Sequence, residues 1–326
     1  MKILTLIIVL ILPVSLVSKE QLNILTYDSF TSEWGPGPSI QKSFEETCDC
    51  QVNWTTAESS GALLSRVKLT NNKEGFDLIL GIDDSLMSEA QDTNLFSPHD
   101  LSSSDLTKLN IEWDNKIFVP FDYGYFSFIY NSSNLDNPPK SFDELANRND
   151  IRIIIMDPRT STPGLGLAKW IYQLKGEQSK DFWKSLQDQI VITAKSWSDG
   201  YGLFLEGEGD AVLSYTTSPA YHAIAESDEN YKAMLFQDGH AKQIEVMAML
   251  KSAPNEKLAQ KFISFAISKG FQNHIPYGNW MYPVIDGLEG SSDFYKFAPM
   301  PISLDQVYAS KEDKDLWIEY WSSSID

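Results

Sequence analysis

Six aromatic side chains lie in or beside segments rich in glycine, proline, serine or asparagine, where loops are expected. They are Tyr27, Trp34, Trp197, Tyr215, Tyr221 and Trp280. Trp34 precedes the run Gly-Pro-Gly-Pro and Trp280 stands in the segment GNWMYP, whereas a core tryptophan usually lies in an apolar run. Rings presented on loops can hold a flat cation by stacking and cation–π attraction. Any one of these rings more often fills a seam between domains, so the prediction of a cation site rests on the whole set.

A second candidate is the turn at residues 157–166 (DPRTSTPGLG), which follows an apolar strand and leads into an apolar helix. Such a turn directs free backbone N–H groups and the positive end of the helix dipole beyond the strand. Ser161 and Thr162 add hydroxyl donors, so the turn could hold an anion such as a phosphate with little basic charge. Taken alone, the pattern fits ordinary helix capping with Pro163 in the first turn better.

The residues offer little for catalysis or for a metal centre. The four histidines, His99, His222, His240 and His274, are scattered without metal-ligand spacing, and the motifs GxSxG, HExxH and GxxxxGK[ST] are missing. Ser218 and His222 are four residues apart, but a helix start with an incidental histidine is a better interpretation than a catalytic pair. We therefore expect a binding protein rather than an enzyme, with no metal and no cofactor.

The two cysteines, Cys48 and Cys50, are separated by one residue. In an oxidising compartment a disulfide is the favoured pairing, although two residues apart in a strand is a strained span for that bond. A reduced pair and a metal site stay open as alternatives, and the metal site lacks a nearby histidine.

The amino terminus and the charge point to an exported protein. Lys2, an apolar run at 3–17 and the polar residues 18–20 predict a signal peptide at residues 1–18 and a periplasmic location. The run is shorter than the roughly 20 apolar residues that span a bilayer. The net charge of −19 without a basic stripe disfavours nucleic acid and anionic lipid as partners. It suits a cationic ligand, although acidic exported proteins are common.

Strands and helices alternate along the chain. Strands are expected at 22–27, 76–81, 151–156 and 211–215. The strand at 76–81 is expected to end in an acidic loop at Asp83 and Asp84, and the strand at 151–156 leads into the turn that carries Ser161. Helices are expected at 39–47, 62–70, 142–148, 165–174, 181–186 and 256–267. Alternation of this kind predicts an α/β protein with a mostly parallel sheet and ligands at the carboxyl ends of the strands.

Two long β-rich runs, at 117–131 and 242–250, predict two chain crossings that form a hinge between two α/β lobes. The expected division is 19–121 with 247–285 for lobe 1 and 122–246 for lobe 2, with the C-terminal segment 286–326 unassigned. Asp122 interrupts the first run, and a carboxylate in mid-strand is costly to bury without a partner. Asp122 is therefore our candidate to face a cation, with fixation of the crossing strands by backbone N–H groups as the alternative.

Several runs resemble those of the bacterial periplasmic thiamine-binding proteins, the substrate-binding part of thiamine ABC importers. These runs are 27–30 (YDSF), 34–38 (WGPGP), 119–126 (VPFDYGYF), 157–166 (DPRTSTPGLG), 213–222 (LSYTTSPAYH) and 279–284 (NWMYPV). The resemblance covers residues 22–285 and is weak from Asp286 onward. It implies a type II periplasmic-binding fold and a monomer that binds thiamine, thiamine monophosphate or thiamine diphosphate. It also implies delivery to the membrane permease of an ABC importer and no catalysis.

The resemblance places the ligand among the six aromatic residues named above. It places the phosphate or hydroxyethyl end near Ser59 and Ser60, near Ser161 and Thr162, and along the run Tyr215, Thr216, Thr217 and Ser218. Where the family has an acidic residue followed by glycine, this chain has Ser59-Ser60-Gly61, which leaves the preference among the three ligands open. The alternative function is a ferric-ion or other small-cation binding protein of the same fold, for which Tyr215 and Tyr221 are the available hint.

Overall fold

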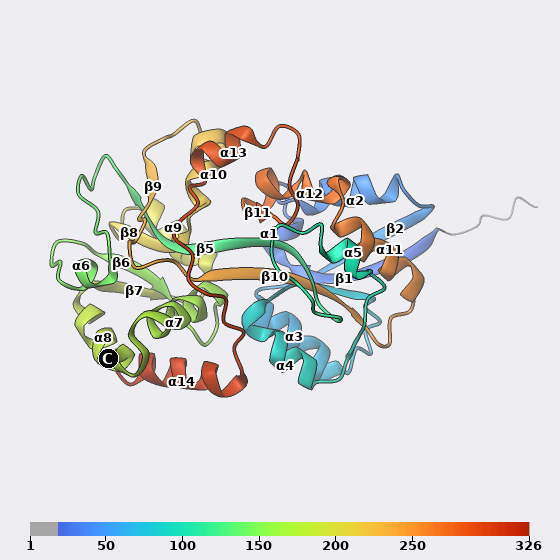
Figure 1. Cartoon of the computed structure of the whole chain (residues 1–326), viewed down its shortest axis with the longest axis horizontal. Coiled ribbons are helices and arrows are strands. Elements are labelled where there is room, and N and C mark those ends of the chain that lie inside the picture. The colour runs from blue at the N-terminus through green and yellow to red at the C-terminus, as the bar shows by residue number, and fades with distance from the viewer. Residues whose placement is uncertain (1–18, 326) are drawn as a thin grey trace, which may run out of the picture.

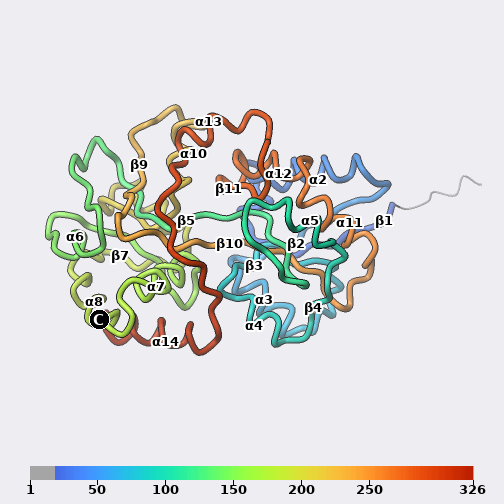
Figure 2. Tube along the Cα trace, viewed as in Figure 1, coloured from blue at the N-terminus to red at the C-terminus, as the bar shows by residue number. Residues whose placement is uncertain are grey.

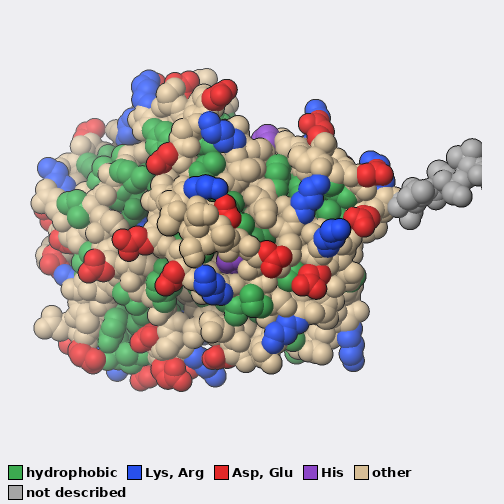
Figure 3. Space-filling model, turned by 45° about the vertical axis from the view of Figure 1, so that its right-hand side comes forward, with side chains coloured by type: hydrophobic (Ala, Val, Ile, Leu, Met, Phe, Trp, Pro, Cys, Tyr) green, Lys and Arg blue, Asp and Glu red, His purple; other side chains and the backbone are tan. Residues whose placement is uncertain are grey.

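The computed structural model describes residues 19–325. The predicted signal peptide, residues 1–18, lies outside these residues. Within the described range, no helix is long and apolar enough to cross a membrane. On the face shown in Figure 3, basic side chains are interspersed with acidic ones and form no stripe.

One half of the structure is built on a sheet of five main strands in the order β2-β1-β3-β10-β5. Their bounds are β1 (Glu20–Tyr27), β2 (Cys50–Ala57), β3 (Leu78–Asp83), β5 (Val119–Asn131) and β10 (Lys242–Leu250). The short strands β4 (Phe96–Ser97) and β11 (Tyr282–Pro283) pair with β10 and β5. β1 runs parallel to β2 and β3, whereas β10 is antiparallel to both β3 and β5.

The other half continues from β5 in the order β5-β8-β6-β7. The bounds are β6 (Ile153–Met156), β7 (Ile190–Ala194), β8 (Ala211–Tyr215) and β9 (Tyr231–Ala233), of which β9 pairs with β5. β6 is parallel to β7 and β8, and β8 is antiparallel to β5. The strands β5 and β10 thus run through both halves, as Figure 1 shows.

Helices cover the sheets on both sides (Figure 1). Those of the first half are α1 (Asp28–Thr31), α2 (Gly37–Glu45), α3 (Ser60–Thr70), α4 (Met87–Asp92), α5 (Ser103–Leu106), α11 (Glu256–Ala266) and α12 (Lys269–Gln272), with the 3-10 turn η1 (Asp84–Leu86) and the π-helical turn η4 (Ile275–Asn279). Those of the second half are α6 (Phe142–Ala146), α7 (Thr162–Lys175), α8 (Ser179–Leu186), α9 (Trp197–Leu205) and α10 (Ser218–Ala225), with the 3-10 turns η2 (Gly176–Gln178) and η3 (Gln187–Gln189). The expected α/β class with alternating elements is confirmed.

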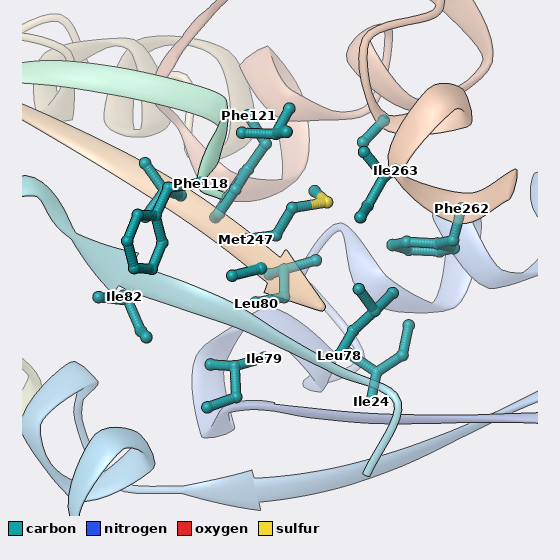
Figure 4. Packing of buried hydrophobic residues seen from close by; sticks show 14 of the residues in the cluster. Ile24, Leu78, Ile79, Leu80, Ile82, Phe118, Phe121, Met247, Phe262 and Ile263 are labelled. Atoms are coloured by element: carbon teal, nitrogen blue, oxygen red, sulfur yellow. The ribbon is translucent and has the colours of Figure 1, made fainter. Parts of the chain in front are cut away.

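The buried hydrophobic residues form two separate clusters, which define the two lobes used below. The lobe 1 core is drawn in Figure 4 and includes Ile24, Leu80, Phe121, Met247 and Phe262. The lobe 2 core is centred on Phe128, Phe142, Trp170, Trp183 and Phe236. Along β5 the chain changes core between Tyr125 and Phe126, and along β10 between Ala241 and Ile244. Both crossing strands are long and largely apolar because they run past both cores, and only a few polar residues, such as Asp122 in β5 and Glu245 in β10, interrupt them.

Local sequence sets most helix starts. Ser141, Ser196 and Asn255 each accept a hydrogen bond from a backbone N–H in the first turn of α6, α9 and α11, as expected for N-cap residues. α7 begins at Thr162, earlier than the expected residue 165, because Ser161 is its N-cap and Pro163 lies in its first turn. The sequence analysis missed β2 and β7, whose side chains are mostly polar or only half-buried.

Of two expectations for residues near the ends of elements, one is wrong and the other, the favoured disulfide, is confirmed. The expected acidic loop at Asp83 and Asp84 is wrong, because Asp83 is the last residue of β3, Asp84 opens η1, and both are buried. Both carboxylates can be buried because each accepts hydrogen bonds, described below. A disulfide joins Cys48 to Cys50, with their Cα atoms 5.3 Å apart. Only Cys50 belongs to a strand, and Cys48 lies in the turn before it.

The C-terminal segment adds a third crossing, so the two crossings expected from the sequence are incomplete. After β11, Phe294 of α13 (Ser292–Phe297) packs into the lobe 1 core. The chain then runs past His240, whose backbone bonds to Ile302 and Leu304, and enters α14 (Lys311–Ser322). Trp317 and Trp321 of α14 are buried in the lobe 2 core. Figure 2 shows this segment, in red, passing from one lobe to the other.

Candidate functional site

Side chains from both lobes meet where the crossing strands pass between them. Thr162, at the start of α7, donates its hydroxyl to Oδ2 of Asp83 at the end of β3, over 2.9 Å. The rings of Tyr221 on α10 and Trp280, which follows η4, contact edge to face with centroids 5.3 Å apart. Three of the residues proposed from the sequence are thereby placed at one junction.

A polar network links four side chains at the centre of this junction. The hydroxyl of Tyr27 donates to Oε2 of Glu245 over 2.8 Å. The amide nitrogen of Asn279 contacts Oδ2 of Asp122 at 2.5 Å, Oε2 of Glu245 at 3.3 Å and the hydroxyl of Tyr27 at 2.9 Å. Asp122 on β5 and Glu245 on β10 are register partners, which places both carboxylates on the hinge strands.

The carboxylates of this network lie in a strongly desolvated place. Asp122 is fully buried and Glu245 is 8% exposed. Burial, reinforced by the charge of Glu245, raises the pKa of Asp122 well above its usual range. Burial also raises the pKa of Glu245 to about 7, and the nearby Asp83 adds to the shift. Oδ1 of Asp122 has no hydrogen-bond partner. The site therefore favours the neutral form of these acids unless a positive charge enters it.

Tyr215 connects the network to lobe 2. Its hydroxyl donates to Oε1 of Gln243 over 2.8 Å, and its ring packs on that of Phe126. Gly124 leaves room for this ring, because a Cβ at that position would lie 2.6 Å from Cε of Met281 and 3.1 Å from Tyr215. Burial raises the pKa values of Tyr27 and Tyr215 well above their usual range. Both phenols are accordingly neutral hydrogen-bonding groups at ordinary pH.

The loop that carries Trp280 has an unusual backbone. Trp280 has a φ of +55°, in the left-handed region that non-glycine residues rarely adopt. Gly278 of the same loop lies against Pro36, where a Cβ would come within 2.7 Å of the proline Cα. The loop of Trp34 is thus a neighbour of the Trp280 loop, but Trp34 itself is 59% exposed and takes no part in the network. Backbone strain of this kind clusters at functional sites.

The serines predicted to bind the phosphate end differ in whether their hydroxyl groups already have a partner in the protein. Ser60 donates to the carbonyl oxygen of Gly81 over 2.6 Å, and Gly81 in turn packs on the ring of Tyr27. Ser59 is the N-cap of α3 and accepts from the N–H of Ala62. Ser161 is buried at the N-cap of α7, but its side chain makes no capping bond. Of the two serines that head helices, only Ser161 thus has a hydroxyl left free for another role.

The run from Tyr215 to Ser218 lies where lobe 2 meets lobe 1. The indole N–H of Trp197 donates to Oγ of Ser214 over 2.8 Å, and Ser214 bonds to Ser218 at the same distance. Thr216 lies 3.4 Å from the hydroxyl of Tyr282, and Thr217 faces Sδ of Met281 at 4.0 Å. Both threonines are buried, and their side chains face residues of the lobe 1 core.

Four residues of the junction were missed from the sequence: Asp83, Gln243, Glu245 and Asn279. A signal for two of them was present, because Gln243 and Glu245 interrupt the apolar run of β10 as Asp122 interrupts that of β5. Asp83 was assigned to a loop, and Asn279 offers no signal of its own. Within residues 19–325 no three His, Cys, Asp or Glu side chains are arranged to hold a metal ion.

Comparisons with known proteins agree with this arrangement. The sequence matches the family described as bacterial extracellular solute-binding protein over residues 39–275. A thiamine-binding periplasmic protein of Salmonella typhimurium is 42% identical over 313 residues, which cover 94% of either chain. A solved structure of a periplasmic thiamin binding protein is 40% identical, with a TM-score of 0.88 over 97% of this chain and 99% of that chain.

A ferric binding protein from Campylobacter jejuni shares the fold at 21% identity, with a TM-score of 0.75 over 93% of this chain and 99% of that chain. The type II periplasmic-binding fold and the resemblance seen in the sequence are confirmed. The chain belongs to the bacterial extracellular solute-binding protein family, in the group of the thiamine-binding periplasmic proteins.

Proposed function

We propose that this protein captures thiamine, thiamine monophosphate and thiamine diphosphate in the periplasm and delivers them to the membrane permease of an ABC importer. The observation that carries the proposal is the junction of aromatic rings and carboxylates without a basic partner, built from both lobes. Thiamine contains a flat aminopyrimidine, which can stack on aromatic rings. It also contains a permanently charged thiazolium ring, which suits both aromatic rings and carboxylates as partners. The named relatives are binding proteins for the same vitamin.

The proposed ligand lies among Tyr27, Tyr215, Tyr221 and Trp280, with Trp34 at the rim. Asp122 would face the cation. The phosphate or hydroxyethyl end would extend toward Ser59, Ser60, Ser161 and Thr162, and toward Trp197 and the turn from Thr216 to Ser218. The free hydroxyl of Ser161 supports the phosphate subsite, because a serine that served only as a cap would bond to its own helix.

We further propose that the protein works as a monomeric two-lobed clamp. The proposed lobes are residues 19–121 with 247–285 and residues 122–246, after removal of the signal peptide at 1–18. The two hydrophobic cores move the first border to 125/126 and the second to 241–244, and they add α14 to lobe 2. Contacts such as Thr162 to Asp83 and Tyr221 to Trp280 join the lobes in the present conformation. A ligand that touches both lobes stabilises this closed form, and closure is the signal that the permease reads.

Native mass spectrometry of protein purified from cells tests the identity of the ligand. The expected result is a bound mass of thiamine or one of its phosphates. Retention of another small molecule, with no binding of thiamine by calorimetry, would overturn the proposal. A ferric ion as ligand would give coloured protein, and the raised pKa values of Tyr27 and Tyr215 disfavour the tyrosinates that iron needs.

Trp280→Ala tests the aromatic part of the site. The substitution removes a stacking and cation–π surface, so we expect thiamine to bind more weakly by about 1 to 3 kcal/mol. Calorimetry on folded protein measures the change, with Tyr320→Ala as the control. Tyr320 is an aromatic residue of α14 that bonds to Glu177 and not to the junction. Unchanged affinity in Trp280→Ala would remove this ring from the site.

A further inference from the structure

The pair of carboxylates on the hinge strands has too few donors. Glu245 receives the hydroxyl hydrogen of Tyr27, and Asp122 receives a hydrogen of the Asn279 amide. The same amide nitrogen has three acceptors within reach but only two hydrogens to give. The amide of Gln243 approaches Glu245 only to 3.4 Å. Oδ1 of the fully buried Asp122 is left without any partner.

The surroundings supply no positive charge to compensate. The titratable groups that face the pair are Tyr27 on β1, Asp83 on β3 and Tyr215 on β8, all of them neutral or acidic. Asn279 of η4 is uncharged, and so is Thr162 of α7, which bonds to Asp83. The other α7 side chain at the junction, Lys169, is bound to Asp84 and not to the pair. Among the described residues, no lysine, arginine or histidine forms an ion pair with any of the three carboxylates. Two ionised carboxylates in such a place are costly, and a shared proton removes that cost.

The proposed function supplies the missing charge, and the inference rests on it. We propose that Asp122 and Glu245 hold one proton between them in the empty protein and release it to solvent when the positive charge of the ligand arrives. The carboxylate pair then selects a permanent organic cation over a neutral molecule of the same shape. Glu245, which the sequence analysis did not single out, becomes a specificity-determining residue with Asp122.

The exchange of a proton for a cation has a measurable consequence. Below the pH at which the pair loses its proton, binding must displace it, so affinity falls by up to about tenfold for each unit of pH. Above that pH the proton is already gone and affinity levels off. The number of protons released on binding accordingly falls from about one toward zero as the pH rises through neutrality.

Calorimetric titration with thiamine, in buffers of different ionisation enthalpy between pH 6 and pH 8, measures this number. The comparison ligand is the neutral analogue in which a thiophene replaces the thiazolium ring. Its aminopyrimidine is the same as that of thiamine, so titration of that ring contributes equally to both. We expect proton release and a pH-dependent affinity with thiamine, and neither with the neutral analogue, which should also bind more weakly.

The variants Glu245→Gln and Asp122→Asn keep the shape of the side chains and remove the titrating pair. Each should abolish proton release, flatten the pH profile and narrow the difference in affinity between the two ligands. Glu46→Gln is the matched control, because Glu46 is exposed and the same charge is lost. Melting curves identify a variant that fails to fold. In that case the comparison of thiamine with the neutral analogue on the unaltered protein tests the inference.

Three results would overturn the inference. One is tight binding of thiamine without proton release, together with equal affinity for the neutral analogue, in which case the proposed function survives. Another is the same proton release caused by sodium or potassium ions alone, which would make the pair an inorganic cation site. The third is failure of thiamine to bind the unaltered protein at all, which would remove the proposed function and this inference with it.

Discussion

Buried carboxylates at the lobe junction differ in how many hydrogen-bond donors they have. Asp84 has several donors and a countercharge, whereas Asp122 and Glu245 have few donors and no countercharge. Asp84 accepts hydrogen bonds from Nζ of Lys169 at 2.9 Å, from the backbone N–H of Ile244 at 2.8 Å and from Nε2 of Gln306 at 2.7 Å. Its ion pair with Lys169 is almost fully buried. Asp122 accepts from Asn279 alone. One group is complete within the protein, and the other is not.

The difference separates a structural role from a binding role. Lys169 comes from α7 in lobe 2, Ile244 from a crossing strand and Gln306 from the C-terminal crossing. Asp84 therefore joins lobe 2 and two of the segments that pass between the lobes. Asp122 and Glu245 also lie on crossing strands but have no countercharge. A satisfied buried charge holds the lobes together, whereas an unsatisfied one is retained only if something outside the chain completes it.

The largest effect is expected from removing the countercharge of Asp84. Lys169→Met keeps much of the side-chain volume but leaves Asp84 as a buried carboxylate without its cation. We expect the free energy of unfolding to fall by about 3 to 5 kcal/mol. Denaturant titration measures it, with the exposed Lys180→Met as a control that should change by less than about 0.5 kcal/mol. A loss below about 1 kcal/mol would erase the contrast between the two groups.

Glu245→Gln is expected to raise, and not lower, the free energy of unfolding of the ligand-free protein. The raised pKa of Glu245 means that its contribution to stability is fully present below the ordinary pKa of glutamate and is lost as the pH rises through about 7. Glutamine has no proton to lose, so the variant should be more stable than the unaltered protein above pH 7, by about 1 to 3 kcal/mol. Denaturant titrations at pH 5 and pH 8 compare the two. Destabilisation at both pH values would show that Glu245 serves the structure instead.

A smaller effect, on ligand affinity, is expected from Ser161→Ala in the proposed phosphate subsite. Ser161→Ala removes a hydroxyl that makes no capping bond, so stability should change little. Thiamine monophosphate and diphosphate should each bind more weakly by about 1 kcal/mol, and thiamine by less. Ser141→Ala is the control, because Ser141 does cap its helix and should cost stability but no affinity. Equal losses for all three ligands would show that the Ser161 hydroxyl does not serve the phosphate end.

The smallest effect on stability is expected at Glu89, a carboxylate near the surface that is paired with two lysines. Glu89 bonds to Lys314 on α14 and to Lys68 on α3, and these bonds lower its pKa to about 2. Its contribution is present above the ordinary pKa of glutamate and is lost as the pH falls toward 2. Lys314 is buried, but the Glu89 carboxylate is partly exposed and keeps its bond to Lys68. Lys314→Met should therefore cost only about 1 kcal/mol at neutral pH. Acid unfolding curves should show a smaller difference between variant and unaltered protein near pH 2 than at pH 6.

The sequence predicts the frame of this protein better than its polar contacts. The crossing strands were predictable because each is long and largely apolar. Edge strands such as β2 and β7 were missed because few of their residues are buried. The contact of Asn279 with Asp122 spans 157 residues and depends on the register of β5, β10 and β11. That register follows from the packing of both lobes, which no local pattern encodes.

The candidate site shows the same limit. A polar residue inside an apolar strand identified Asp122, and the same rule applied to β10 would have found Glu245. The rule could not have found that the two face each other, nor that Thr162 bonds to Asp83. The six aromatic residues were selected by their loops, and the structure connects Tyr27, Tyr215, Tyr221 and Trp280 to the junction while Trp34 stays exposed.

The C-terminal crossing affects the order in which the chain can fold. Trp317 and Trp321 complete a core whose other residues were made much earlier, and Lys314 bonds to Glu89 across 225 positions of sequence. Contacts so distant in sequence form only after long loops close, which slows folding. A chain that emerges from its amino terminus cannot finish lobe 2 until the last helix has been synthesised. The last contacts of lobe 2 therefore form only when synthesis of the chain is nearly complete.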